Sequence, residues 1–194
     1  VVLLAPAQRE YLADILTATE YIDLAIPRGS KGLIDFVRDN SRVPVIETGA
    51  GIVHTYVDAS ANLQQAKSII TNAKVRRVSV CNALDTLILH RDLLAELPEM
   101  MQTMGDLGVE VYADEDAFKV LSEKYTAVLN PADAEHVGTE FLSMKMSIKT
   151  VSSLDEAMEH IHRYSSRHSE AIVAEDTEVI ERFLNNVDAA AVYA

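Results

Sequence analysis

The chain has 194 residues, of which 48% are hydrophobic and 24% charged, and it contains a single cysteine. This composition fits one substantial globular domain, or one domain with a piece of another, and excludes a disordered or repetitive chain. A formal charge of −13 repels phosphate backbones and anionic lipids, so we expect neither nucleic-acid nor membrane binding. A lone cysteine cannot form an internal disulfide, and the first ten residues lack a signal-peptide pattern. We therefore expect a soluble protein of the cytoplasm.

Strand and helix patterns alternate along the whole chain, which indicates an α/β fold. The first half predicts strands at 1–4, 22–26, 43–47 and 52–58, and helices at 8–18, 33–40 and 63–73. The second half predicts strands at 85–90, 109–113, 144–151, 170–176 and 189–194, and helices at 93–107, from 154 onward and at 179–187. We expect Pro98 to interrupt the helix at 93–107, and a looser stretch around Asn130 and Pro131. The last strand ends without a polar tail, so we expect the chain to be an excised piece.

Cys81 lies in the loop predicted between the helix at 63–73 and the strand at 85–90. Arg76 and Arg77 raise the local positive potential, which favours the thiolate form that attacks carbonyl carbons. The alternative is a buried thiol that packs as a small hydrophobic residue, with both arginines turned to solvent at the end of a helix. The spacing alone does not decide between these interpretations.

The turn "PRGSKG" at 27–32 lies between a predicted strand and a predicted helix, where backbone N–H groups can hold a phosphate. It matches neither the P-loop nor the dinucleotide-binding glycine pattern. His160 and His162 are two residues apart and point to different helix faces, so we predict no metal site. Met100, Met101 and Met104 are predicted to pack in the core.

Six segments resemble the γ-glutamyl phosphate reductases, also called glutamate-5-semialdehyde dehydrogenases, of the aldehyde dehydrogenase superfamily. In chain order they are "IPRGSKGLIDFV", "VPVIETGAG", "VHTYVD", "SVCNALDTLILH", "GTEFLSMKMSIK" and "SLDEAMEHIHRY…HSEAIVAED". The resemblance runs from about Tyr21 to Ala194. It implies a three-layer αβα catalytic domain of the aldehyde dehydrogenase type, with a largely parallel sheet. Residues 1–46 then correspond to a remnant of the cofactor-binding domain, and residues 47–194 to a C-terminally incomplete catalytic domain.

The resemblance also implies a reaction. This reaction is the NADPH-dependent reduction of L-glutamyl 5-phosphate to L-glutamate 5-semialdehyde and phosphate, in proline biosynthesis. Cys81 falls on the family's nucleophile and would form a thioester that accepts a hydride. The backbone N–H of Cys81 is the local candidate for stabilising the oxyanion.

Other site residues follow from the same resemblance. Glu140 aligns with the glutamate that contacts the nicotinamide ribose, and Gly29 and Ser30 belong to the turn near the cofactor pyrophosphate. Arg76, Arg77 and Asn82 are candidate substrate-binding residues. The implied partners are the small-molecule substrate, further copies of the chain in a homo-oligomer, and glutamate 5-kinase. The 194 residues alone are expected to have negligible turnover, because most of the cofactor-binding domain is absent.

Glu47 lies 34 residues before Cys81, where hydrolytic aldehyde dehydrogenases have the glutamate that activates water. Water attack on the thioester would defeat a reductase, so we do not assign Glu47 as a general base. Two alternatives stay open. One is a hydrolytic aldehyde dehydrogenase that uses Glu47 as its base, and the other is a non-catalytic module derived from the enzyme. Val78, Val75 with Arg76, and Val53 depart from the family's pattern near Cys81.

Overall fold

The computed structural model describes residues 10–29, 31–47 and 49–194. Contacts between residues divide the chain into two compact units, with the boundary between Ala50 and Gly51. The predicted strand at 1–4 and the beginning of the predicted helix at 8–18 lie outside the described residues.

The first unit contains the helices α1 (Leu12–Thr17) and α2 (Lys31–Asn40). The predicted strands at 22–26 and 43–47 are wrong as strands, because their pairing is limited to one parallel bridge between Ala25 and Val45. Pro44 directly precedes this bridge and has no N–H to donate to a longer ladder.

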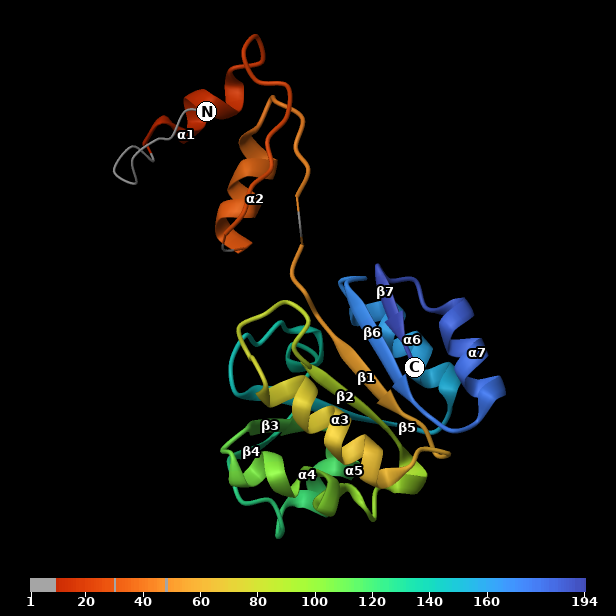
Figure 1. Ribbon diagram of the computed structural model, residues 1–194. Coiled ribbons are helices and arrows are strands. Elements are labelled where there is room, and N and C mark those ends of the chain that lie inside the picture. The colour runs from red at the N-terminus through yellow and green to blue at the C-terminus, as the bar shows by residue number, and fades with distance from the viewer. Residues whose placement is uncertain (1–9, 30, 48) are drawn as a thin grey trace. The chain divides into compact units, whose positions relative to one another are not determined.

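The second unit is built on a seven-stranded sheet in the order β4-β3-β5-β2-β1-β6-β7, and all of its strand pairs are parallel (Figure 1). Its strands are β1 (His54–Val57), β2 (Thr86–His90), β3 (Glu110–Ala113), β4 (Leu129–Pro131), β5 (Lys145–Val151), β6 (Ser169–Val173) and β7 (Ala191–Tyr193). Its α-helices are α3 (Leu63–Val75), α4 (Leu97–Asp106), α5 (Glu115–Leu121), α6 (Leu154–Tyr164) and α7 (Thr177–Asn186).

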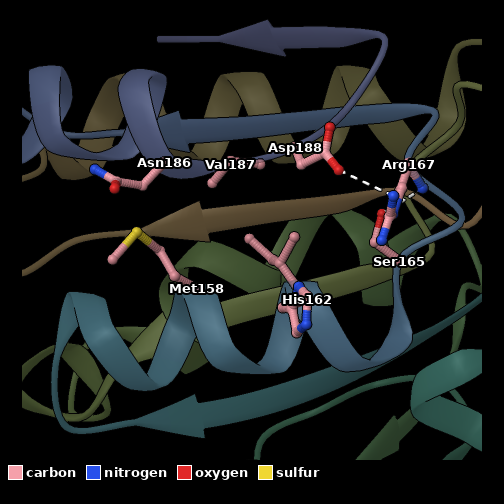
Figure 2. Close-up of a pocket in the computed structure, with 8 residues that line it drawn as sticks. Met158, His162, Ser165, Arg167, Asn186, Val187 and Asp188 are labelled. Atoms are coloured by element: carbon pink, nitrogen blue, oxygen red, sulfur yellow. Dashed lines mark hydrogen bonds and ion pairs between the residues drawn. The ribbon is translucent and has the colours of Figure 1, made fainter.

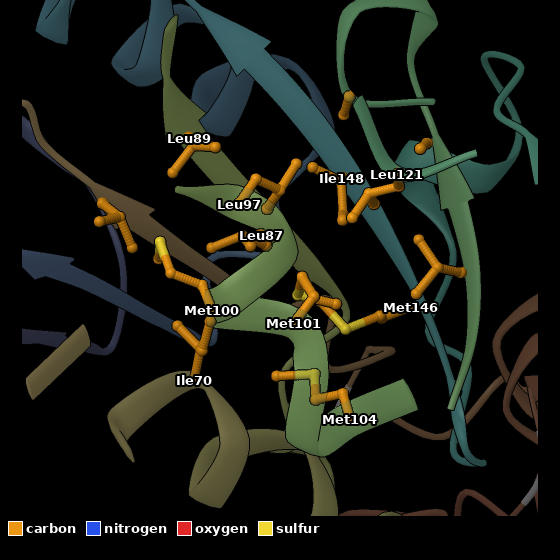
Figure 3. Close-up of a cluster of buried hydrophobic side chains, with 14 of the residues drawn as sticks. Ile70, Leu87, Leu89, Leu97, Met100, Met101, Met104, Leu121, Met146 and Ile148 are labelled. Atoms are coloured by element: carbon orange, nitrogen blue, oxygen red, sulfur yellow. The ribbon is translucent and has the colours of Figure 1, made fainter. Parts of the chain in front are cut away.

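Two hydrophobic cores lie on opposite faces of this sheet. Helices α3, α4 and α5 cover one face, and α6 and α7 cover the other (Figure 1). Successive side chains of β1 point to opposite faces of the sheet, so Val57 packs in the first core and Tyr56 in the second. Met100, Met101 and Met104 of α4 fill the first core, as predicted (Figure 3). The three-layer αβα architecture with a parallel sheet is therefore confirmed.

Two local predictions are wrong for reasons that involve proline. Helix α4 begins at Leu97, and Pro98 occupies its first turn, where its missing N–H costs no hydrogen bond. A short 3₁₀ turn, Arg91–Leu93, precedes this helix. The stretch around Pro131 forms the edge strand β4 and pairs with β3 alone, a position that tolerates proline.

Both side chains of the capping box predicted before α6 accept backbone hydrogen bonds, although Glu156 takes the N–H of Ser152 and not that of the N-cap residue Ser153. Ser153 Oγ accepts a hydrogen bond from Glu156 N at 3.2 Å, and Glu156 Oε2 accepts one from Ser152 N at 2.7 Å. These bonds satisfy backbone donors at the start of the helix. Among the helices of the described residues, none is long and apolar enough to cross a membrane.

His160 on α6 is buried, with 8% of its surface exposed, whereas His162 on the same helix is exposed. Its ring lies edge-on to that of His54, with the ring centroids 5.5 Å apart. Burial, followed by the nearby His54, lowers the pKa of His160 to about 3. The folded state therefore holds this imidazole neutral at pH values where the unfolded chain protonates it.

We predict that acid destabilises the fold through His160. Because its folded pKa lies below the unfolded value, this stability is fully present above about pH 6.5 and is lost as the pH falls toward 3. Between pH 7 and 5 the loss is about 2 kcal/mol, at 1.36 kcal/mol per pH unit. Urea unfolding at both pH values should show a smaller loss for His160→Gln, while His162→Gln keeps the wild-type loss. Equal losses in all three proteins would contradict this assignment.

Candidate active site

Cys81 is exposed and lies in the turn between α3 and β2. It therefore precedes the amino end of β2. Because the sheet is parallel, the segments that enter β5, β2, β1 and β6 all reach the same edge, and these four strands are neighbours in that order. The segments that lead into them, together with the first residues of β6, form the candidate site.

Four consecutive backbone N–H groups at the start of β1 donate to side chains from this edge. The bonds run from Gly51 to Glu140 Oε1 (2.9 Å), from Ile52 to Ser166 Oγ (2.8 Å), from Val53 to Asp85 Oδ2 (3.3 Å) and from His54 to Glu170 Oε2 (3.1 Å). Three of the four acceptors are carboxylates, and hydrogen bonds to ionised acceptors are the stronger kind. The segment 51–54 is thus fixed to the loops before β5, β2 and β6 and to strand β6 itself.

Gly51 lies directly against Cys81. A Cβ atom on Gly51 would lie 2.2 Å from the carbonyl oxygen of Cys81 and 2.8 Å from its Cβ. Only a glycine permits this close approach. Since Gly51 also donates its N–H to Glu140, one residue links the thiol-bearing loop to the carboxylate.

Lys74 and Asp85 are buried on either side of the thiol in the sequence. Lys74 Nζ donates to the carbonyl oxygen of Leu84 at 2.8 Å, and Asp85 accepts from the backbone N–H of Phe141 at 3.0 Å. Burial lowers the pKa of Lys74 to about 8, although the charge of Asp85 acts against the shift. Burial raises the pKa of Asp85 to about 6, against the effect of its hydrogen bonds and of Lys74.

The predictions from sequence missed Gly51, Lys74 and Asp85. A signal for Lys74 was present, because it continues the buried helix stripe of Ala66 and Ile70 at the next i+4 position. A lysine on such a stripe is unusual, since charged side chains are rarely fully buried. No comparable local signal marks Asp85.

The predicted substrate-binding residues Arg76, Arg77 and Asn82 are all exposed. Arg76 caps the end of α3 and lines a shallow groove of about 580 Å³ on α3, together with Thr103 of α4. Residues 59–84 contain four cations and no acidic residue, although the chain as a whole carries a charge of −13. Helix α3 and the turn that carries Cys81 are therefore richer in cations than the chain as a whole.

Glu47 and Gly29 belong to the first unit. Glu47 Oε1 lies 3.6 Å from Arg38 Nη1, and both side chains are partly exposed. Gly29 precedes α2, and a Cβ atom on it would lie 2.8 Å from Leu33 Cδ2. Ser30, the other predicted pyrophosphate residue, lies outside the described residues.

A cavity of about 40 Å³ lies between α6 and the segment that leads into β7 (Figure 2). It is lined by Met158, Ile161, His162, Ser165, Arg167, Asn186, Val187 and Asp188. The cavity holds a few water molecules at most, and the segments of Cys81, Gly51 and Glu140 contribute nothing to its lining. Within the described part of the chain, no three His, Cys, Asp or Glu side chains gather as a metal site requires.

Comparison with known proteins identifies close relatives. The chain is 60% identical over 192 residues to γ-glutamyl phosphate reductase of Pelodictyon phaeoclathratiforme. The matched residues make up 98% of the chain and 46% of the relative. The crystal structure of γ-glutamyl phosphate reductase from Thermotoga maritima is 40% identical, with a TM-score of 0.90, over 98% of this chain and 45% of that one. The chain thus spans about half the length of the curated relatives it matches. No family model matches the chain.

A more distant structure shares the fold. The propionaldehyde dehydrogenase of a Clostridium phytofermentans bacterial microcompartment is 18% identical, with a TM-score of 0.69, over 95% of this chain and 49% of that one. This likeness establishes the aldehyde dehydrogenase type of fold that the sequence predicted.

We predict that Gly51→Ala disturbs the loop of Cys81. The added methyl group has no room beside Cys81, so the variant should lose about 1–3 kcal/mol of unfolding free energy and alkylate at a changed rate. Urea unfolding and iodoacetamide labelling of the single thiol measure both effects. Gly49→Ala is the matched control, because a Cβ there meets no atom within 4 Å. If the two variants behave alike, the contact does not constrain the loop.

Proposed function

Because the chain is related along its whole length to γ-glutamyl phosphate reductases, we propose that it carries the catalytic domain for the reaction of that family. The reaction is the NADPH-dependent reduction of L-glutamyl 5-phosphate to L-glutamate 5-semialdehyde, with release of phosphate. The observation that carries the proposal is the 60% identity over 98% of the chain. The single exposed thiol at the shared edge of four strands supports it.

Cys81 acts as the nucleophile. Its thiolate sulfur forms a bond to the acyl carbon, the bond from that carbon to the phosphate oxygen breaks, and phosphate leaves with the electron pair. The product is a thioester on Cys81, and the cation-rich segment 59–84 favours the approach of the anionic acyl phosphate. When bound, a reduced nicotinamide supplies the hydride that converts the thioester to the aldehyde and frees the thiolate.

Glu140 fits the role of holding the nicotinamide ribose. Its Oε1 is fixed by the Gly51 N–H, which leaves Oε2 without a hydrogen bond from any described residue. A partly buried carboxylate oxygen in this state can accept a hydrogen bond from a ribose hydroxyl. Gly29, Ser30 and the start of α2 form the candidate pyrophosphate turn, and Arg76, Arg77 and Asn82 the candidate substrate contacts.

Glu47 forms an ion pair with Arg38, so the reductase proposal does not assign its carboxylate as the base that activates water. The non-catalytic alternative requires an inert thiol, whereas Cys81 is exposed in a cation-rich segment.

The proposal also gives a cellular setting. The reaction is a step of proline biosynthesis in the cytoplasm, and residues 1–46 represent part of the cofactor-binding domain. An acyl phosphate hydrolyses readily in water, so association with glutamate 5-kinase would shorten its exposure. A homo-oligomer is part of the same proposal.

We predict that L-glutamyl 5-phosphate transfers one glutamyl group to the chain, even where NADPH oxidation is negligible. Thioester formation needs only Cys81 and the substrate, whereas hydride transfer needs a nicotinamide within about 3.5 Å of the acyl carbon. Intact-mass spectrometry should show one hydroxylamine-sensitive adduct, absent in Cys81→Ser. An equal adduct on Cys81→Ser would reject the assigned nucleophile.

Glu47→Gln should leave the lifetime of this thioester within about twofold of wild type, because Glu47 is not the base that activates water. The decay of the adduct, followed by mass spectrometry, measures the lifetime. Glu20→Gln, at an exposed glutamate of the same unit, is the control. The hydrolytic alternative instead requires a lifetime about 100-fold longer in Glu47→Gln, since a general base contributes on that order.

A further inference from the structure

Asp85 binds two segments of the candidate site at once. Its Oδ1 accepts from the N–H of Phe141 at 3.0 Å, and its Oδ2 accepts from the N–H of Val53 at 3.3 Å. Its own N–H donates to the carbonyl oxygen of Val53 at 3.0 Å. The side chain is only 2% exposed, so water does not compete for these bonds.

The segments that Asp85 joins are those that carry the reacting groups. Phe141 follows Glu140 directly, and Val53 lies two residues after Gly51. Asp85 itself lies four residues after Cys81 on the same loop. One carboxylate therefore fixes the loop of the thiol against the glycine that contacts it and against the loop of Glu140.

Lys74, near the end of α3, also bonds to the loop that carries Cys81 and Asp85. Its Nζ donates to the carbonyl oxygen of Leu84, which directly precedes Asp85. The Lys74 side chain is fully buried. The charges of Lys74 and Asp85 stabilise one another, which offsets part of the cost of burying both. An apolar pair would pack here at lower cost, but it could not bond the three segments together.

We propose that Asp85 is a positioning residue, with Lys74 as its counter-charge, that holds Cys81 against Gly51 and Glu140 in the geometry required for acyl transfer. The inference rests on the proposed role of Cys81 as the nucleophile. Asp85 does not touch the substrate. It acts through the backbone of the three segments.

The first test measures the rate of alkylation of Cys81 by iodoacetamide, from pH 6 to 9, in the whole 194-residue chain. Asp85→Asn leaves one acceptor oxygen for two N–H donors, so one segment is released. We expect the alkylation rate to change about tenfold, since small displacements alter the reactivity of a positioned group strongly. Asp85→Glu keeps both acceptor oxygens and should restore part of the wild-type rate.

Asp58→Asn is the matched control. Asp58 is also buried, but it follows β1 at the opposite edge of the sheet, where it accepts hydrogen bonds from Ser60 and Tyr56. The control should lose stability while its alkylation rate stays within about twofold of wild type, because no contact joins it to the loop of Cys81. Equal rate changes in Asp85→Asn and Asp58→Asn would overturn the proposal, as would an unchanged rate in a folded Asp85→Asn.

A second measurement uses the folded wild-type chain and does not depend on any variant that fails to fold. The amide protons of Val53 and Phe141 should shift together in NMR spectra as Asp85 titrates near pH 6. The Ser60 amide, bonded to Asp58, should stay constant, because the hydrogen bonds to Asp58 outweigh its burial and lower its pKa. Lys74 and Glu140 are the other charged groups that face Asp85, so Glu140→Gln should retain the paired shift.

Independent behaviour of the Val53 and Phe141 amides would overturn the proposal. Neither measurement needs turnover, so they separate this inference from the proposed reaction. If both effects are found but the wild-type chain forms no glutamyl adduct, the proposed reaction is rejected and Asp85 remains the residue that orders the loop.

Discussion

The backbone N–H groups of residues 51–54 are the constraint on which the candidate site depends. A buried or partly buried N–H needs an acceptor, and here four in succession find theirs in side chains of neighbouring segments. Three of the bonds fix the loops before β5, β2 and β6 against the start of β1, and the fourth fixes strand β6 itself. The thiol, the carboxylate of Glu140 and the buried Asp85 thereby acquire defined positions relative to one short segment.

The regular part of the fold follows from local patterns. Strand β2 and helix α6 were predictable because an apolar β-branched run and a capping box each leave a signal within a few residues. The strands predicted at 22–26 and 43–47 failed because a strand exists only where a partner continues its ladder. Pro98 and Pro131 were misread because proline is tolerated in the first turn of a helix and at the edge of a sheet.

The candidate site was predictable only in part. Cys81 and Glu140 could be proposed from their segments, because "SVCNALDTLILH" and "GTEFLSMKMSIK" each resemble a known family. Their proximity depends on the spatial order β5-β2-β1, which no local pattern specifies. Asp85 acquires its two acceptor bonds through the same order. Ligands of open parallel sheets usually bind at the carboxyl ends of the strands, whereas this thiol lies at their amino ends.

The sequence separations of these four hydrogen bonds bear on how the chain folds. Their partners are 89, 114, 32 and 116 residues apart, so three of them close very long loops. A long-range contact forms only after the chain has lost the conformational entropy of closing a long loop, so such contacts tend to form late. The bond from Val53 to Asp85 is the most local of the four. A chain that has formed β1 and β2 can hold this bond while Glu140 and Glu170 are still distant, so the geometry around the thiol is completed among the last events of folding.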